Sequence, residues 1–384
     1  MNPPGPMHAA LRETESGCLA IADISGYTSY LGSAELAHAQ DVLEDLTETV
    51  VRALSPPMKL SKLEGDAVFV YMPGNQVDAS MLLDAFDAAY FAFRRRQDAI
   101  DRATQCDCNA CVLIPRLDLK FVAHHGQFAR QHVAGGEELS GSDVILVHRL
   151  LKNHVAEAIG HAGYALYTDA VVAAMGVDPA RLRMRRQTEE VEGLGSVEGW
   201  VQDLHERWEE ERERRRVKVS REEAVGVTSY EVPAPRSVTW SYLTDPALRV
   251  TWTPGIQRVD QSTANGRRGV GTQNHCIHGK NASLEEILDW RPFDYYTILN
   301  NARMPLLKPM RLTYELEDIA GGTRVTEYVA PGQGFGQRVL VRVAGRMMAG
   351  VFARAQASLR SAVAAGQAAP DESNRLAEIS TGDT

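Results

Sequence analysis

The spacing of apolar residues changes once along the chain. From Cys18 to about Leu204, short apolar runs such as LAIA alternate with segments in which apolar residues recur three or four positions apart. This alternation predicts strands and amphipathic helices in an α/β arrangement. Helices are expected from Leu36 to Leu54, from about Ser80 to Arg102, and from Ser142 to about Ile159.

The pattern after residue 225 is rich in predicted strands. Runs such as VGVTSYEV, YYTILNNA and MRLTYELEDI are separated by Pro, Gly, Asn and Asp, which are the usual turn residues. One long amphipathic helix is expected from Gln337 to about Ala364, because its apolar residues form a single stripe at helical spacing. Strands that are apolar on both faces, followed by such a helix, predict a sheet that curls around the helix.

These patterns predict two folded domains, at residues 17–204 and 225–364. Disordered ends are expected at residues 1–16 and 365–384, because both segments lack periodicity and are rich in Pro, Gly, Ser, Ala and acids. The segment between the domains, 205–224, is a predicted charged helical linker. Its Glu and Arg residues at i, i+4 spacing favour an exposed helix, and a binding role for the arginines is the alternative.

The whole-chain composition restricts the function classes. The protein has 384 residues, a formal net charge of −9 and 24% charged residues. An acidic balance without a basic patch argues against nucleic acid as a partner. The chain start lacks a secretory pattern and no apolar run approaches the roughly 18 residues of a membrane span, so a cytoplasmic protein without a membrane span is expected. Five cysteines in such a chain favour reduced thiols over a disulfide framework.

Two aspartates lie at the ends of predicted strands. Asp23 follows the first apolar strand, and Asp66 opens the strand in SKLEGDAVFV, where a desolvated carboxylate needs a compensating metal, cation or hydrogen bond. In an α/β sheet both carboxylates can point into one crevice. Oxygen ligands from separate elements suit Mg²⁺ or Mn²⁺. The alternative is that Asp23 caps the following helix and Asp66 is an ordinary turn residue.

Four segments of the first domain carry a family resemblance. They are IADISGYT (Ile21 to Thr28), KLEGDAVFV (Lys62 to Val70), LKFVAHHG (Leu119 to Gly126) and GSDVILVHR (Gly141 to Arg149). In this order they resemble the catalytic domain of class III nucleotidyl cyclases, with CDCNAC and HRLLKN indicating an outlying branch. The resemblance implies an α+β fold, a ferredoxin-like cyclase-type α/β sandwich. It also implies that ATP is bound and that cyclic AMP and pyrophosphate are formed.

The resemblance also implies roles for individual residues. Asp23 and Asp66 would hold two Mg²⁺ or Mn²⁺ ions against the triphosphate. Gly26 would let backbone N–H groups approach the phosphates. Lys62 and Glu138 would read the adenine, since related guanylate cyclases carry glutamate at the lysine position.

Arg149 matches an arginine that stabilises charge on the transferring phosphorus, although an arginine salt-bridged on a helix face is equally consistent with the residue alone. Ile145 departs from the family, which has an asparagine there that orients the attacking hydroxyl. Losing such a contact can cost about 10²-fold in rate, and His148 and Lys152 are candidate replacements. Nucleotide and metal binding are therefore favoured over efficient cyclisation, and the alternative is a catalytically silent signalling or dimerisation module. In the resembled family the active site forms between two such domains, so for a chain with one copy that carries every site residue the resemblance implies a head-to-tail homodimer.

The segment CDCNAC places Cys106, Cys108 and Cys111 close together. Such thiolates can bind Zn²⁺ or an iron–sulfur cluster. Only Cys108 and Cys111 have the C-x₂-C spacing that is standard for zinc sites. Three reduced thiols without a metal are therefore an equally supported alternative.

The second domain resembles the START-like, polyketide-cyclase-type (SRPBCC) helix-grip fold through VPAPRSVTWSYLTDPALRVTW and the closing helix. The resemblance implies a curved antiparallel sheet around a long C-terminal helix, with a cavity for a hydrophobic small molecule or lipid. We expect this domain to regulate the first one, or to act as a carrier that the first domain dimerises. Residues that can line the cavity are Trp252, His275, Trp290, Tyr296, Tyr314 and Tyr328.

Overall fold

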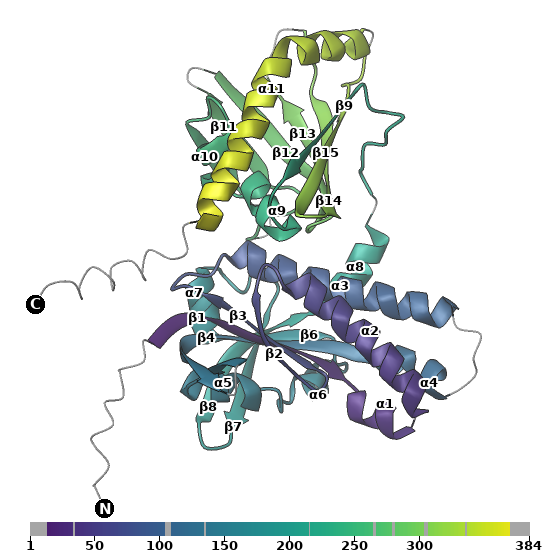
Figure 1. The fold of residues 1–384 in the computed structure, drawn as a ribbon, viewed down its shortest axis with the longest axis vertical. Coiled ribbons are helices and arrows are strands. Elements are labelled where there is room, and N and C mark those ends of the chain that lie inside the picture. The colour runs from purple at the N-terminus through teal and green to yellow at the C-terminus, as the bar shows by residue number, and fades with distance from the viewer. Residues whose placement is uncertain are drawn as a thin grey trace, which may run out of the picture. The chain divides into compact units, whose positions relative to one another are not determined.

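A computed structural model gives the fold of the protein (Figure 1). The chain forms two compact units, Met1–Arg214 and Arg215–Thr384. The structure describes residues 14–33, 35–103, 109–133, 136–214, 216–263, 266–278, 281–302, 306–334 and 336–368.

The first unit is built on an eight-stranded sheet. Its order is β2-β3-β1-β4-β6-β8-β7, and β5 pairs with β4. Strands β4 and β6 are parallel, whereas the other neighbours are antiparallel. The strands are β1 (Thr14–Ser25), β2 (Lys59–Glu64), β3 (Ala67–Pro73), β4 (Asp118–Val133), β5 (Gly136–Ser140), β6 (Tyr164–Thr168), β7 (Arg185–Val191) and β8 (Gly195–Asp203).

Helices pack on both faces of this sheet because its central strands are apolar on both sides. Residues Cys18 to Ala22 of β1 are all buried. On one face, Phe86 stacks on Phe121 with ring centroids 4.5 Å apart, and on the other, Ile21 packs in a core cluster with Val147. The helices are α1 (Tyr27–Ser33), α2 (Leu36–Leu54), α3 (Ala79–Ala103), α4 (Asn109–Val112), the 3₁₀ turn η1 (Ile114–Arg116), α5 (Ser142–Arg149), α6 (Val155–Ile159), α7 (Asp169–Met175) and α8 (Leu204–Glu213).

Two local predictions differ from the structure. The single helix expected from Ser142 to Ile159 is broken into α5 and α6. Asn153 lies in the break, where its Oδ1 accepts hydrogen bonds from the Val155 N–H at 3.0 Å and the Tyr164 hydroxyl at 2.7 Å. Asparagine side chains that bond to the backbone in this way compete with helix continuation. Strand β1 also begins at Thr14, inside the segment predicted to be disordered.

The second unit is a seven-stranded antiparallel sheet in the order β10-β11-β12-β13-β14-β15-β9, crossed by the long helix α11 (Figure 1). Helix α11 packs against β9, α9 and α10. The elements are β9 (Gly226–Val232), α9 (Arg236–Thr244), α10 (Pro246–Trp252), β10 (Arg258–Ser262), β11 (Gln273–His278), β12 (Asn281–Arg291), β13 (Tyr295–Asn301), β14 (Met310–Ile319), β15 (Gly322–Ala330) and α11 (Gln337–Ala368). The predicted α+β class, with an α/β sandwich followed by an antiparallel sheet and a long C-terminal helix, is confirmed.

The strand register places one row of side chains across the second sheet. Trp290, Tyr296, Tyr314 and Glu327 are successive partners on β12, β13, β14 and β15. Trp240 of α9 packs against this row, with its ring centroid 4.7 Å from that of Trp290 and 5.4 Å from that of Tyr296. This aromatic face is therefore the inner face of the grip.

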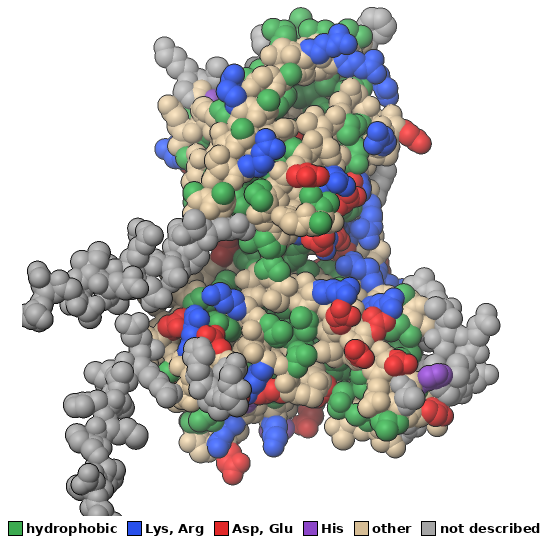
Figure 2. All heavy atoms as spheres, viewed as in Figure 1, with side chains coloured by type: hydrophobic (Ala, Val, Ile, Leu, Met, Phe, Trp, Pro, Cys, Tyr) green, Lys and Arg blue, Asp and Glu red, His purple; other side chains and the backbone are tan. Residues whose placement is uncertain are grey.

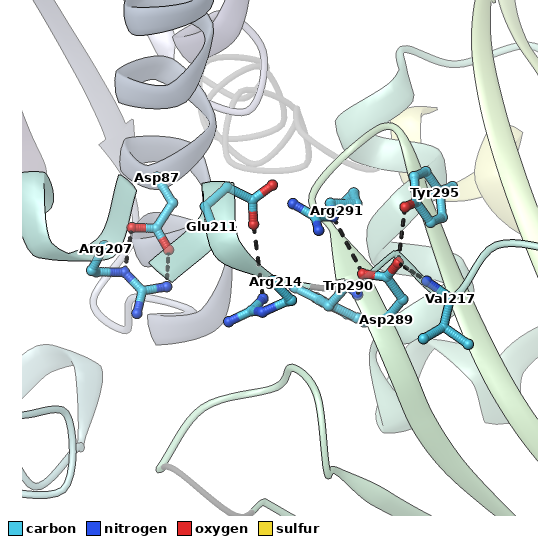
Figure 3. Close-up of polar contacts among 9 residues, drawn as sticks. All are labelled: Asp87, Arg207, Glu211, Arg214, Val217, Asp289, Trp290, Arg291 and Tyr295. Carbon is cyan, nitrogen blue, oxygen red and sulfur yellow. Dashed lines mark hydrogen bonds and ion pairs between the residues drawn. The ribbon is translucent and has the colours of Figure 1, made fainter. Parts of the chain in front are cut away.

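Helix α8 and the segment after it are each fixed within their own unit (Figure 3). In the first unit, Arg207 of α8 donates to both carboxylate oxygens of Asp87 on α3, at 2.8 and 2.5 Å. In the second unit, the Val217 N–H donates to Asp289 Oδ2 at 2.8 Å. The segment predicted to be an exposed charged linker therefore has buried contacts on both sides of Arg214.

Candidate functional site

Asp23 lies near the carboxyl end of β1, an inner strand of the first sheet. It pairs with Ala67 of β3 on one side and with Lys120 of β4 on the other. Its Oδ2 lies 3.1 Å from Lys120 Nζ, which also donates to the Leu151 carbonyl at 3.1 Å. Sequence patterns alone do not single out Lys120, although LKFV shows a cation inside an otherwise apolar run.

Asp66 lies in the β2–β3 turn, directly before Ala67, the residue that pairs with Asp23. Gly65 provides the positive φ of this turn, +67°. Burial raises the pKa of Asp66 to about 6, and the nearby charge of Asp23 adds to this effect. A backbone hydrogen bond and the charge of Lys120 partly oppose it. The structure thus brings the two predicted metal ligands together beside one lysine.

This arrangement has the donor chemistry of a divalent-cation site. Two carboxylates from neighbouring strands supply hard oxygen ligands of the kind that Mg²⁺ and Mn²⁺ prefer. Burial, together with the Asp23 charge, raises the pKa of Asp66 by more than the Lys120 charge lowers it. Three His, Cys, Asp or Glu side chains do not converge anywhere in the described residues, so substrate or water oxygens would have to complete the coordination.

The chain turns sharply after Asp23. Gly26 has a φ of +89°, and its carbonyl accepts hydrogen bonds from the Tyr30 N–H at 2.9 Å and the Ser29 hydroxyl at 3.0 Å. A Cβ at this position would lie 3.3 Å from the Arg116 carbonyl oxygen. Glycine therefore meets both the conformational and the steric demands of the turn.

Lys62 belongs to a chain of charged contacts next to the aspartates. Its Nζ lies 2.7 Å from Glu64 Oε1, and His148 Nε2 of α5 lies 2.9 Å from the other oxygen of Glu64. The hydrogen bond that Lys62 donates to Glu64 raises the pKa of Lys62, and the charge of Glu138 adds to this effect. Glu138 is exposed on β5. Lys62 and Glu138, the predicted base-reading pair, are thus electrostatic neighbours, with Glu64 and His148 as further members.

Arg149 and Ile145 both lie on α5. Arg149 ends α5, and its Nη1 would lie 3.1 Å from a Cβ placed on Gly193 in the β7–β8 turn. Among the described residues of the first unit, Arg149 makes no ion pair with either aspartate. Ile145 is 52% exposed on α5, where an apolar side chain gains little from packing.

The cysteine cluster cannot be located. Cys106 and Cys108 lie outside the described residues, and only the backbone of Cys111, in α4, is described. The metal-binding prediction for these thiols remains a prediction. Cys18 and Cys276 are free and buried.

The inner face of the second unit holds two carboxylates whose pKa values are shifted in opposite directions. Glu285 accepts two hydrogen bonds from Arg249, at 2.6 and 3.0 Å. Burial would raise the pKa of Glu285, but the Arg249 charge outweighs it and the pKa is lowered. Glu327 accepts a hydrogen bond from the Tyr230 hydroxyl at 3.0 Å, and burial raises its pKa to about 7. Polar groups set among aromatic rings are typical of ligand sites.

Two of the residues predicted to line this face lie elsewhere. His275 is exposed and alternates with the buried Asn274 and Cys276 on β11. Tyr328 follows Glu327 on β15, so its side chain points to the opposite face. Trp252 lies at the end of α10 and donates its indole N–H to the Tyr242 carbonyl at 2.7 Å.

Comparison with known proteins gives matches for both units. A family model described as "Protein of unknown function (DUF2652)" matches residues 43–158. A model described as "Polyketide cyclase / dehydrase and lipid transport" matches residues 217–364. The uncharacterized protein Rv2561/Rv2562 of Mycobacterium tuberculosis is 37% identical over 162 residues, which cover 42% of this chain and 73% of that protein.

Parts of this chain are also similar to solved structures. The guanylyl cyclase Cya2 has a TM-score of 0.41 and 15% identity, over 50% of this chain and 92% of that chain. Protein NE0264 from Nitrosomonas europaea has a TM-score of 0.29 and 19% identity, over 35% of this chain and 94% of that chain. No described helix is long and apolar enough to cross a membrane.

Proposed function

The chain belongs to the same family as the uncharacterized Mycobacterium tuberculosis protein Rv2561/Rv2562, and we propose that its first unit binds ATP with Mg²⁺ or Mn²⁺ and converts it to cyclic AMP and pyrophosphate. The observation that carries this proposal is the convergence of Asp23 and Asp66 from β1 and the β2–β3 turn. These carboxylates would hold the metal. When bound, the metal would favour ionisation of the ribose hydroxyl and neutralise the leaving pyrophosphate.

The remaining residues supply orientation and charge. The Gly26 turn presents backbone shortly after Asp23, and its N–H groups would bond to phosphate oxygens. Lys62 and Glu138, which lie near one another, supply a donor and an acceptor for the edge of the adenine ring. Lys120 supplies a second positive charge next to Asp23.

We infer that Arg149 acts in the same reaction through a second copy of the chain. It lies at the end of α5 against the β7–β8 turn, and among the described residues it makes no ion pair with Asp23 or Asp66. A head-to-tail homodimer would place the arginine of one copy near the metal ligands of the other, where it stabilises negative charge on the phosphorus. The placement of Arg149 supports this arrangement.

The proposal is tested with the purified full chain, ATP and Mn²⁺, by quantifying cyclic AMP and pyrophosphate. We expect both products from the wild type and none from Asp66→Ala. Asp41→Ala, which changes an exposed residue of α2, is the matched control and retains activity. Absence of product from the wild type, or unchanged product from Asp66→Ala, rejects catalysis.

A second candidate function is a catalytically silent nucleotide-binding or dimerisation module. Two observations favour it: Lys120 already neutralises much of the Asp23 charge, and Ile145 offers no hydrogen bond on the exposed surface of α5. Calorimetry distinguishes the two functions. Metal-dependent ATP binding without turnover supports the silent module.

For the second unit, we propose a hydrophobic ligand on the inner face around Trp240, Trp290 and Tyr296, which regulates the first unit. The close packing of these rings together with the carboxyl of Glu327 supports a ligand with an apolar body and a polar group. Native mass spectrometry of the full chain should show a co-purifying small molecule that Trp240→Ala loses.

A further inference from the structure

Helix α11 begins with two side-chain stripes of different chemistry. Residues four positions apart lie on one face of a helix, and adjacent positions are about 100° apart around its axis. The arginine stripe consists of Arg338, Arg342 and Arg346. The apolar stripe next to it consists of Val339, Val343 and Met347.

Both stripes face away from the protein. Met347 is 79% exposed, Val339 63% and Val343 49%, and the three arginines are exposed as well. Gln337 and Val341, at the same spacing on another face, are buried and attach this part of the helix to its unit. Apolar side chains follow the upper end of α11 in Figure 2. Single exposed apolar residues are common, but an aligned row marks an interaction surface.

A neighbouring loop extends this surface. The Leu306 side chain is 82% exposed. Its carbonyl accepts a hydrogen bond from Gln337 Nε2 at 3.0 Å, and the Lys308 N–H donates to Gln337 Oε1 at 3.0 Å. Leu306 and the exposed Lys308 are therefore held beside the first turn of α11, next to the two stripes.

The charge of this surface is opposite to that of the protein. Helix α11 has no acidic residue in 32 positions, whereas the whole chain carries a formal charge of −9. Among the described residues, the arginine stripe makes no ion pair. The surface is therefore complementary to a partner that is both anionic and able to accept apolar side chains.

We propose that this surface docks on an anionic lipid bilayer, with the apolar stripe and Leu306 among the headgroups and the arginine stripe on lipid phosphates. A basic amphipathic helix that lies in the membrane interface has this composition. A symmetric contact with a second copy would set the arginine stripes against each other. Nucleic acid would use the arginines but not the apolar stripe. The proposal does not depend on the nucleotide site.

The test is co-sedimentation of the full chain with two kinds of vesicle. One contains phosphatidylcholine alone, and the other contains equal parts of phosphatidylcholine and phosphatidylglycerol. We expect binding to the anionic vesicles only. Arg342→Gln with Arg346→Gln should weaken it by roughly 20-fold or more, since each basic residue near an anionic surface contributes about fivefold. Met347→Ser should also weaken it, while the measured melting temperature stays unchanged.

Two matched controls separate the surface from general effects of charge and apolar exposure. Arg360→Gln changes an exposed arginine of the same helix about 21 Å from Arg346, which is beyond the Debye length of about 8 Å. Val227→Ser changes an exposed apolar residue of β9. Both should bind as the wild type does. The proposal is overturned if wild type stays in the supernatant with both vesicles, or if the controls weaken binding as much as the stripe variants. It is equally overturned if Met347→Ser changes the oligomeric state and leaves vesicle binding intact.

Discussion

Lys120 Nζ lies 3.1 Å from Asp23 Oδ2, so a lysine and a divalent ion would compete for the same carboxylate. We expect Lys120→Gln to bind Mn²⁺ about tenfold more tightly, or ~1.4 kcal/mol, because the neutral amide leaves the Asp23 charge available. The same variant should bind Mn²⁺ with ATP more weakly, since a positive charge near the phosphates is lost. Isothermal titration calorimetry measures both affinities.

Lys59→Gln is the matched control for this variant. Lys59 is exposed on β2, so its substitution should change neither affinity. If Lys120→Gln leaves the affinity for Mn²⁺ alone unchanged, the ion does not bind at Asp23.

Asp66 should make metal binding dependent on pH. Its pKa is raised to about 6 by burial and by the charge of Asp23, so a proton competes with the metal below about pH 6. We expect the Mn²⁺ affinity to be constant above about pH 7 and to fall up to tenfold per unit below about pH 6. Calorimetry at several pH values tests this. A wild-type affinity that is flat between about pH 5 and pH 7 contradicts it, and Asp66→Asn should show weak binding without the pH dependence.

The sequence predicts much of the first unit because its signals are local. Strands β1 and β3 are apolar on both faces, β1 is followed by Gly26, and Gly65 precedes β3. These local signals place Asp23 and Asp66 at strand ends before any long-range contact is known. Lys120 could not be assigned a role in this way. Its contact with Asp23 depends on the register between β1 and β4, which is set by long-range pairing.

Face assignments in the second unit depend on register for the same reason. Trp290, Tyr296 and Tyr314 lie on the inner face, whereas Tyr328 does not, because a shift of one residue moves a side chain to the other side of the sheet. The composition of a strand gives its tendency to be buried but not which residues face inward. The break after α5 likewise depends on the contact between Asn153 and Tyr164, which helical periodicity does not reveal.

The ion pair between Arg207 and Asp87 should fix α8 to the first unit. Asp87 is almost completely buried, so Asp87→Asn would remove the carboxylate that pairs directly with the guanidinium. Removing one partner of a buried pair typically costs about 3–5 kcal/mol. We expect amide hydrogen exchange in α8 to become roughly 100-fold faster in this variant, because the local opening of the helix no longer has to break the ion pair.

The exposed pair of Arg52 and Glu48 on α2 provides the control. Both side chains are more than half exposed, and such pairs contribute at most about 1 kcal/mol. Glu48→Gln should therefore leave the exchange of α8 unchanged. Wild-type exchange rates in α8 of Asp87→Asn would show that other contacts, such as the packing of Trp208 on Phe91, hold the helix.

Glu327 should make the stability of the second unit fall as the pH rises. Its pKa is about 7 in the folded protein, because burial disfavours the charged form, against an ordinary value of 4.5. The folded state therefore holds a proton that the unfolded state releases between these two values, and stability declines across this range as the pH increases. Glutamine is neutral at every pH and can still accept the hydrogen bond from the Tyr230 hydroxyl. We thus expect Glu327→Gln to gain stability relative to the wild type as the pH rises from about 5 to 8.

Urea unfolding of the full chain at several pH values measures this difference. Comparing the variant with the wild type at each pH removes the contributions of other titrating groups, including Asp66, whose pKa is also raised. Glu317→Gln on the neighbouring strand β14 is the control, because Glu317 is exposed and its substitution does not relieve a buried charge. A difference between Glu327→Gln and wild type that stays constant across this pH range would mean that water solvates the Glu327 carboxylate in the folded state. The inner face would then lack the low-dielectric surroundings that a hydrophobic ligand site requires.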